Sequence, residues 1–227
     1  MIKAVLLDVD NTLLDFNKSA NATIKHALKE LGLKYSANVL DVFLRVNDTL
    51  WQKIEQKEIT REELHRIRWS IIFDELGIIA DGHEMERLFL SGLEDYAIPV
   101  DGAIDIVKYL SGKYKLYTAS NAPHAQQVKR LTLSGMMPYI EKILNFENQG
   151  INKPQKQFFS ECLKAVSPAK KEETAIIGDS LSADIAGGKS VGITTIWFNR
   201  HGGDAPAPDN GLCDYMVKSL AEIKAIL

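Results

Sequence analysis

The chain has 227 residues, which is enough for one large domain or for one domain with a sizeable insert. Hydrophobic residues make up 45% and charged residues 25%, an ordinary composition for a soluble globular protein. The 27 Lys and Arg against 30 Asp and Glu give a net charge of −3, so nothing in the totals supports a nucleic-acid polymer as a partner or an acidic disordered tail. The composition excludes fibrous and disordered classes and names no function.

The two cysteines, Cys162 and Cys213, are too few for a disulfide framework in a chain of this size. We expect two reduced thiols in a reducing compartment. The first apolar run stops at Asp8, which makes it too short for a signal peptide or a membrane span. Together these features predict a cytoplasmic protein with no membrane partner.

The first element expected in chain order is a short buried strand at residues 2–7. From about residue 17 to residue 96 the apolar residues recur at helical spacing and fall into four expected helices. Thr60 and Glu63 have the spacing of a capping box at the start of the third of these helices. No strand-like alternation interrupts this block, so it predicts an all-helical unit.

After Pro99 short β-prone runs alternate with helices, which predicts parallel βαβ units with right-handed crossovers. The runs are continuously apolar, as expected when helices cover both faces of a sheet. Strands are expected at residues 115–120, 143–146, 174–179, 194–198 and 214–217, followed by a closing helix. We therefore predict a doubly wound, Rossmann-like α/β core of residues 1–15 and 97–227, with an all-helical insert at residues 16–96.

Polar residues stand where the expected strands end or in the loops that follow. They are Asp8, Asp10, Thr12, Ser120, Asn121, Lys153, Asp179, Ser180 and Asp184. In doubly wound sheets the ligand site lies beyond the carboxyl ends of the strands. The parallel topology would therefore bring these residues to one edge, although they are far apart in the sequence.

The chemistry of this set points to a phosphate. Asp8 and Asp179 side by side would repel each other unless a cation lay between them. Oxygen ligands favour Mg²⁺, which commonly takes one or two carboxylates and completes its shell with water and phosphate. Lys153 would add positive charge opposite phosphoryl oxygens, and Ser120 has a hydroxyl hydrogen to donate. The set predicts a site that neutralises a phosphate while a carboxylate does covalent chemistry.

Each of these residues also has a plain structural interpretation. An aspartate after a strand is often a turn or helix cap. Lys153 before a proline fits a solvated loop, and Gly178-Asp179 fits an ordinary tight turn. Four such motifs in order, each at a strand end or in the loop after it, favour the functional interpretation.

With these residues in this order, the sequence resembles the haloacid dehalogenase-like (HAD) hydrolase superfamily. The motifs that carry the resemblance are Asp8-x-Asp10-x-Thr12, Ser120-Asn121, Lys153-Pro154 and Gly178-Asp179-Ser180-x-x-x-Asp184. The helical insert after the first motif is similar to the small helical (C1-type) cap of phosphatases in that superfamily. The resemblance implies an enzyme that uses Mg²⁺.

The resemblance also implies roles for individual residues. Asp8 would be the nucleophile that attacks phosphorus and forms an aspartyl-phosphate. Asp10 would protonate the leaving oxygen and then deprotonate the water that hydrolyses the intermediate. Asp8, Asp179 and the backbone carbonyl of Asp10 would hold Mg²⁺. The remaining motif residues would brace the loops and bind the phosphate: Thr12, Ser120, Asn121 and Lys153, with Ser180 and Asp184 in support.

Asp10 distinguishes two activities that this resemblance allows, phosphatase and dehalogenase. A dehalogenase of the superfamily attacks carbon and carries no acid at this position. The sequence therefore favours a phosphatase. A phosphosugar or phosphoglycolate phosphatase and a β-phosphoglucomutase-like phosphotransferase share the motifs and stay open. A non-catalytic binding module on the same fold is disfavoured because Asp8, Asp10, Lys153 and Asp179 are all present.

The run Val46–Trp51, followed by Ile59-Thr60, resembles the pyrimidine-type 5′-nucleotidase branch, as does Ile196–Arg200. This resemblance implies a small phosphorylated metabolite as partner, such as a nucleoside 5′-monophosphate, and leaves the oligomeric state open. If the helical insert supplies a nucleobase wall, the residues expected to contribute are Phe16, Asn17, Asn47 and Trp51. Packing of Trp51 inside the insert is an equally open interpretation.

Overall fold

The computed structural model describes residues 1–166, 168–200, 202 and 211–227. The chain divides into two compact units, Met1–Asp15 with Ala97–Leu227 and Phe16–Tyr96. We call the first the core unit, which holds a parallel sheet, and the second the helical unit. Within the described residues, no helix combines the length and the apolar content needed to cross a membrane.

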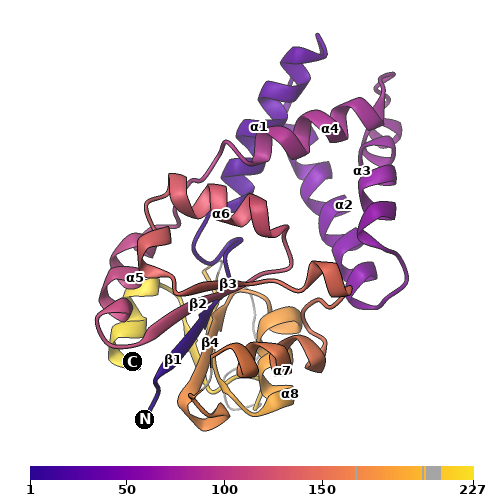
Figure 1. The fold of residues 1–227 in the computed structure, drawn as a ribbon. Coiled ribbons are helices and arrows are strands. Elements are labelled where there is room, and N and C mark those ends of the chain that lie inside the picture. The colour runs from indigo at the N-terminus through magenta and orange to yellow at the C-terminus, as the bar shows by residue number, and fades with distance from the viewer. Residues whose placement is uncertain (167, 201, 203–210) are drawn as a thin grey trace. The chain divides into compact units, whose positions relative to one another are not determined.

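The sheet of the core unit has the strand order β3-β2-β1-β4-β5-β6, and its neighbouring strands all run parallel. The strand nearest the N-terminus, β1, lies in the middle of the sheet between β2 and β4 (Figure 1). The strands are β1 (Ala4–Leu7), β2 (Lys115–Ala119), β3 (Lys142–Leu144), β4 (Thr174–Gly178), β5 (Thr194–Phe198) and β6 (Tyr215–Val217). The predicted doubly wound α/β fold is confirmed.

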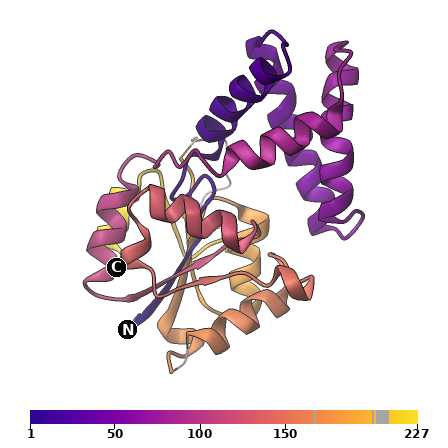
Figure 2. The ribbon, with the colours of Figure 1, turned by 45° about the horizontal axis from the view of Figure 1, so that its top comes forward.

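Alternate residues of β1 face opposite sides of the sheet. Val5 and Leu7 join the apolar cluster that includes Ile106 of α5, whereas Leu6 joins the cluster that includes Phe158 of α7. The helices of the core unit are α5 (Ala103–Ser111), α6 (His124–Leu133), α7 (Lys156–Ala165) and α8 (Gly187–Val191). Figures 1 and 2 show α7 and α8 together on one side of the sheet and α5 on the other, so both faces of the central strand are covered.

The end of the chain differs from the predicted closing helix in its type, because Leu220–Ala225 form a 3₁₀ helix (η6) rather than an α-helix. Its two buried residues, Leu220 and Ile223, are three positions apart, which matches the three residues per turn of a 3₁₀ helix. Shorter 3₁₀ turns lie elsewhere in the core unit: η1 (Met137–Tyr139), η2 (Glu147–Gln149) and η3 (Lys171–Glu173).

The helical unit consists of α1 (Phe16–Glu30), α2 (Ala37–Glu55), α3 (Arg61–Leu76) and α4 (Gly82–Leu93), seen together in Figure 2. The predicted capping box is confirmed: the Thr60 hydroxyl accepts from the backbone N–H of Glu63 at 3.1 Å, and the Glu63 carboxylate accepts from that of Thr60 at 2.8 Å. An aromatic cluster fills the centre of the unit, with the ring of Phe43 5.4 Å from Trp69 and 4.9 Å from Phe89.

Both cysteines of the core unit are buried free thiols. Burial raises the pKa of Cys162 to about 12. A thiol with so high a pKa is almost entirely protonated at neutral pH and is a poor nucleophile. Cys162 is on α7 and therefore acts as a small apolar side chain in the cluster between this helix and the sheet.

Candidate active site

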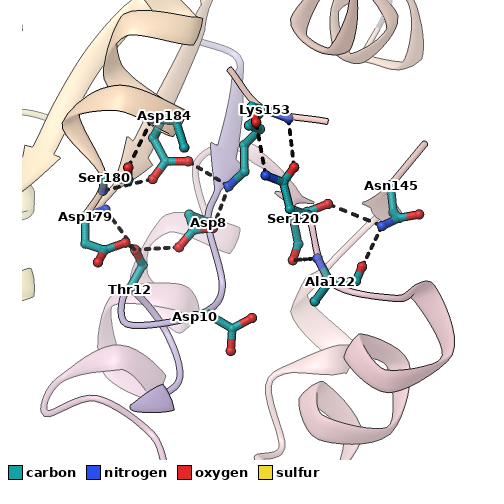
Figure 3. A network of polar contacts seen from close by, with 12 residues as sticks. Asp8, Asp10, Thr12, Ser120, Ala122, Asn145, Lys153, Asp179, Ser180 and Asp184 are labelled. Atoms are coloured by element: carbon teal, nitrogen blue, oxygen red, sulfur yellow. Dashed lines mark hydrogen bonds and ion pairs between the residues drawn. The ribbon is translucent and has the colours of Figure 1, made fainter. Parts of the chain in front are cut away.

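The carboxyl ends of three adjacent strands bring the motif residues of the core unit together. Asp8 follows β1, Ser120 follows β2 and Asp179 follows β4. Because β1 pairs in parallel with both β2 and β4, the three strand ends meet at one edge of the sheet. Figure 3 shows Asp8 linked to Asp179 through Thr12 and paired with Lys153, whereas the Ser120 hydroxyl in the same view bonds the backbone of Ala122.

Lys153 comes from the loop before α7 and contacts two carboxylates (Figure 3). Its Nζ lies 2.6 Å from Oδ1 of Asp8 and 2.7 Å from Oδ1 of Asp184. The three side chains are 4%, 9% and 1% exposed, so these are buried ion pairs. Burial alone would lower the pKa of Lys153, but the charges of Asp184 and Asp8 outweigh it and raise that pKa above its ordinary value. Lys153 is a permanent cation in this site.

Thr12 links the loop after β1 to the loop after β4. Its hydroxyl donates to Oδ2 of Asp8 at 2.9 Å and accepts from the backbone N–H of Asp179 at 3.1 Å. The first loop turns at Asn11, whose φ of +64° lies in the left-handed region that asparagine tolerates. On the other side, Trp197 donates its indole N–H to the backbone oxygen of Asp179 at 2.8 Å. Two carboxylates from distant motifs are thus held next to each other.

Asp184 lies in a π-helical turn, η4 (Leu181–Ala186), directly after β4. Its Oδ1 accepts from Lys153, and its Oδ2 accepts from the backbone N–H of Ser180 at 3.1 Å. A Cβ atom on Gly178 would lie 2.2 Å from Oδ2, so the carboxylate approaches the strand end only because that residue is glycine. The bond to Lys153 places Asp184 to orient the ammonium, and the bond from Ser180 fixes the carboxylate.

Ser120 and Asn121 at the end of β2 have different partners. The Ser120 hydroxyl oxygen accepts from the backbone N–H of Ala122 at 3.1 Å and from Nε2 of Gln127 at 3.0 Å, so its own hydrogen is left to donate. The Asn121 amide bonds the backbone of Lys153 twice, accepting at 2.8 Å and donating at 3.1 Å. Asn121 therefore positions the Lys153 loop, and the predicted contact between its side chain and a phosphate stays a prediction.

The aspartates of the site carry more negative charge than Lys153 balances. Burial raises the pKa of Asp8 to about 7 despite the opposing charge of Lys153, and Asp184 adds to the rise. Burial, followed by the charge of Asp8, raises the pKa of Asp179 well above its ordinary value. A cation beside these carboxylates would favour their ionised forms.

The donor set fits Mg²⁺. Asp8, Asp179 and Asp184 each offer one carboxylate oxygen, and these oxygens lie within 4.8 Å of one another. Bonds from Mg²⁺ to oxygen are about 2.1 Å long, so ligands on opposite sides of the ion are about 4 Å apart. The carboxylate of Asp10 is outside this set (Figure 3), and its predicted metal contact through the backbone carbonyl stays a prediction.

The Asp10 carboxylate has partners on α6 that the sequence motifs do not contain. Nη1 of Arg130 lies 2.6 Å from its Oδ1, and Nε2 of Gln127 donates to its Oδ2 at 2.8 Å. Both partners are fully buried. Their spacing is visible in the sequence, because they stand three residues apart on the helix that follows Ser120 and so share one helix face. That spacing is the feature from which these two residues could have been predicted.

The residues suggested for a nucleobase wall all belong to the helical unit. Asn47 is buried and its Oδ1 accepts from Nη1 of Arg68 at 2.8 Å. Phe16 stacks on an aromatic ring of the unit's core, and the half-buried Trp51 packs against the same core. Asn17 is half-buried on α1. Their contact with a substrate stays a prediction.

The sequence model of the haloacid dehalogenase-like hydrolase family matches residues 2–192. The chain belongs to this family. It is 32% identical over 225 residues to the HAD-hydrolase YfnB of Bacillus subtilis, covering 99% of this chain and 95% of that protein. It is 35% identical over 200 residues to the pyrimidine 5′-nucleotidase PynA of Streptococcus pneumoniae, covering 88% and 84%.

Solved structures agree with this assignment. The crystal structure of YfnB bound to magnesium superposes with a TM-score of 0.91 at 31% identity, covering 100% of this chain and 98% of that one. The L-2-haloacid dehalogenase PA0810 superposes with a TM-score of 0.78 over 100% and 98% of the two chains, but at 18% identity it supports the fold alone. The predicted family and the prediction of an enzyme are confirmed: this chain is a HAD hydrolase.

Proposed function

We propose that this HAD hydrolase is a Mg²⁺-dependent phosphomonoesterase that acts through an aspartyl-phosphate on Asp8. The observation that carries the proposal is the separation of two carboxylates on one loop. Asp8 lies with Lys153 among buried acidic groups, whereas Asp10 is held by Gln127 and Arg130. Two carboxylates in different environments suit the two roles of nucleophile and acid–base catalyst.

In the first half-reaction an oxygen of Asp8 attacks phosphorus, and the bond between phosphorus and the leaving oxygen breaks. The electron pair of that bond goes to the leaving oxygen, which takes a proton from Asp10. Ser120 donates its hydroxyl hydrogen to a phosphoryl oxygen, and the ammonium of Lys153 offsets negative charge as it develops. The products are an alcohol and phosphorylated Asp8.

In the second half-reaction Asp10 accepts a proton from a water molecule. The water oxygen attacks phosphorus, the bond between phosphorus and Asp8 breaks, and inorganic phosphate leaves. Asp8 recovers its carboxylate, and Asp10 is ready to act as an acid again. The alternation needs Asp10 near the leaving oxygen but not bound to the metal through its carboxylate.

Mg²⁺ held by Asp8 and Asp179, with the backbone carbonyl of Asp10, would supply the positive charge that an anionic nucleophile and an anionic phosphate both need. Thr12 holds the two carboxylates in place for this role. With a pKa of about 7, Asp8 is partly protonated at neutral pH in the absence of a further cation. A protonated carboxyl group is a poor nucleophile, which supports metal dependence.

Nucleoside 5′-monophosphates are the substrate class that we favour. Two relatives support them: PynA, and the pyrimidine 5′-nucleotidase YjjG of Escherichia coli, which is 24% identical over 224 residues covering 98% of this chain and 96% of that protein. We assign the choice of leaving group to the helical unit as a cap, with Phe16, Asn17 and Trp51 as the candidate contacts.

Sugar phosphates are the second candidate class. The N-acylneuraminate-9-phosphatase of Mus musculus is 24% identical over 243 residues, covering 100% of this chain and 94% of that protein. A phosphatase for sugar phosphates would use the same core chemistry with a different cap specificity.

Asp10, an acid that a halide leaving group does not need, supports hydrolysis of a phosphate ester over dehalogenation.

A hydrolysis screen tests the proposal. Purified protein would be offered nucleoside 5′-monophosphates, sugar phosphates, phosphoglycolate and an aryl phosphate, with Mg²⁺ and with a chelator. We expect inorganic phosphate only with Mg²⁺ and the highest kcat/KM on a nucleoside 5′-monophosphate. Release of phosphate at the same rate in chelator would contradict the metal dependence, and isomerised sugar phosphate as the product would identify a mutase.

A further inference from the structure

The carboxylate of Asp10 is held at both oxygens by side chains of one helix. Oδ1 accepts from Nη1 of Arg130 at 2.6 Å, and Oδ2 accepts from Nε2 of Gln127 at 2.8 Å. Both side chains are fully buried, whereas the Asp10 side chain is 28% exposed. The donors therefore come from the packed interior of α6, and the carboxylate they hold stands where solvent and substrate have access.

Gln127 also joins Asp10 to the phosphate-binding serine. Its Nε2 donates to Oδ2 of Asp10 and, at 3.0 Å, to Oγ of Ser120. One amide group thus fixes the separation between the hydroxyl expected to hold the phosphoryl group and the carboxylate expected to meet the leaving oxygen. Displacement of the Gln127 side chain would break its hydrogen bonds to Asp10 and to Ser120 at the same time.

The orientation of the Gln127 amide serves the site more than it serves the core. Its Oε1 is buried and accepts a hydrogen bond from no protein group in the described part of the chain. Leaving a buried acceptor unpaired is unfavourable. The amide nevertheless keeps the orientation in which Nε2 donates two hydrogen bonds to site residues. This orientation fits a role in positioning those residues.

We propose that Gln127 and Arg130 are positioning residues for the acid–base function of Asp10, an inference that rests on the proposed phosphatase activity. Each oxygen of a carboxylate has two lone pairs, and the two donors use one on each oxygen. A lone pair remains on each for the proton that passes to the leaving oxygen in the first half-reaction and is taken from water in the second. Gln127 and Arg130 fix the position of these remaining lone pairs of Asp10 relative to the Ser120 hydroxyl.

Leaving-group dependence separates positioning of an acid from a general structural role. An alkyl phosphate has a poor leaving group that needs protonation, whereas the nitrophenolate of p-nitrophenyl phosphate leaves without it. The value of kcat/KM reports the steps up to formation of the phosphoenzyme. A variant that merely lowers the amount of folded protein reduces kcat/KM for both substrates by the same factor.

The experiment compares Gln127→Met and Arg130→Met with wild type on a nucleoside 5′-monophosphate and on p-nitrophenyl phosphate. Gln126→Met is the matched control, because Gln126 is the adjacent buried glutamine on α6 and has no hydrogen bond to Asp10 or Ser120. We expect kcat/KM to fall about 100-fold on the alkyl ester and less than about tenfold on the aryl ester. Arg130→Lys, which keeps a charged donor, should lose less than Arg130→Met.

Equal losses on both substrates, or variants as active as wild type, would overturn the inference, as would a leaving-group dependence of the same size in Gln126→Met. Circular dichroism of each variant checks that it is folded, and Gln127→Met, which removes no charge, carries the test if Arg130→Met does not fold. A wild-type chain that hydrolyses neither substrate would overturn the proposed function itself, and this inference with it.

Discussion

The two units of the molecule each contain a buried polar cluster, and the clusters differ in how completely their charges are paired. The acidic cluster of the core unit consists of Asp8, Asp179, Asp184 and Lys153, so it has three negative groups for one positive group. The arginine cluster of the helical unit consists of Arg68, Glu86, Asn47 and His65 and has one strong cation for one carboxylate.

The arginine cluster is closed by its own partners. Arg68 donates to both oxygens of Glu86, at 3.2 and 2.6 Å, and to Asn47, and its guanidinium lies 4.8 Å from the ring centre of Phe89. His65 completes it with a contact of 2.7 Å to Glu86. A cluster with every strong charge paired holds helices together and has no need of a ligand.

The acidic cluster, in contrast, is incomplete without a cation. Its excess charge appears in the pKa of Asp8 and in that of Asp179, both raised by burial and by neighbouring carboxylates. Strongly perturbed carboxylates cluster at functional sites. The imbalance of a buried polar cluster, rather than its burial or its number of hydrogen bonds, therefore indicates where a ligand binds.

Asp8→Asn should have the largest effect. Removing the nucleophile should lower kcat by about 10⁴-fold or more. Above pH 7 the same change removes a buried negative charge from a cluster with an excess of them, so the metal-free protein should become more stable to unfolding at pH 8. Steady-state kinetics and thermal unfolding in chelator measure the two effects. Asp41→Asn, at an exposed position of α2, is the control and should change neither. A loss of stability in Asp8→Asn would contradict the imbalance.

Arg68→Met tests the closed cluster. The variant leaves Glu86 buried without its main partner, which should cost about 3–5 kcal/mol of unfolding free energy. The matched control is Arg87→Met, which breaks an exposed pair with Glu84 in the same unit and should cost at most about 1 kcal/mol. Denaturant unfolding compares the two variants. Equal costs would mean that the arginine cluster is no more important for stability than a surface ion pair.

Mg²⁺ should stabilise the protein, and the effect should depend on pH. The folded pKa of Asp8, about 7, is raised above its ordinary value of 3.8, so its contribution to stability is fully present below pH 3.8 and is lost as the pH rises through 7. Mg²⁺ binds the ionised form and should offset this loss, by about 2.7 kcal/mol at a concentration 100 times Kd.

Thermal unfolding with and without Mg²⁺ at pH 5.5 and pH 8 measures this dependence. We expect the larger rise in Tm at pH 8, because protons compete with the metal for the carboxylates at the lower pH. Asp8→Asn should lose most of the rise, whereas Arg68→Met should keep it. A rise of the same size at both pH values would show that the metal binds elsewhere.

Gly178→Ala should have a smaller effect on stability than Arg68→Met. The new methyl group would meet Oδ2 of Asp184 at 2.2 Å and displace the carboxylate that orients Lys153. We expect a loss of about 1–3 kcal/mol together with reduced kcat. Gly112→Ala is the matched control, because its added Cβ would make an ordinary contact of 3.6 Å with the backbone oxygen of Tyr109. Full activity in Gly178→Ala would show that catalysis does not depend on the position of the Asp184 carboxylate.

The sequence predicted those features that depend on order along the chain. Alternating apolar strands and helices predict the parallel sheet, and strand ends then locate Asp8, Ser120 and Asp179 at one edge. The partners of Asp10 could not be predicted in the same way, since Gln127 and Arg130 belong to no motif and only the packing of α6 decides which residues its helix face directs to the site.

The use of Asn121 is a second feature that packing decides. Its place beside Ser120 suggests a phosphate contact, which stays a prediction. Its amide also reaches across to the backbone of Lys153, 32 positions later in the chain. Which backbone groups a polar side chain at a strand end can reach depends on how the two loops pack against each other. Local sequence does not contain that information, because the second loop comes from a different part of the chain.

The most direct test of the central claim, that the unbalanced acidic cluster makes Asp8 a nucleophile, is chemical trapping of the intermediate. The enzyme would be quenched in acid during turnover with Mg²⁺ and substrate, then treated with borohydride, which reduces an aspartyl-phosphate to homoserine. Mass spectrometry of the peptide spanning residues 4–18 should find homoserine at position 8 alone. No reduced residue in that peptide, or reduction at Asp10 instead, would contradict the account.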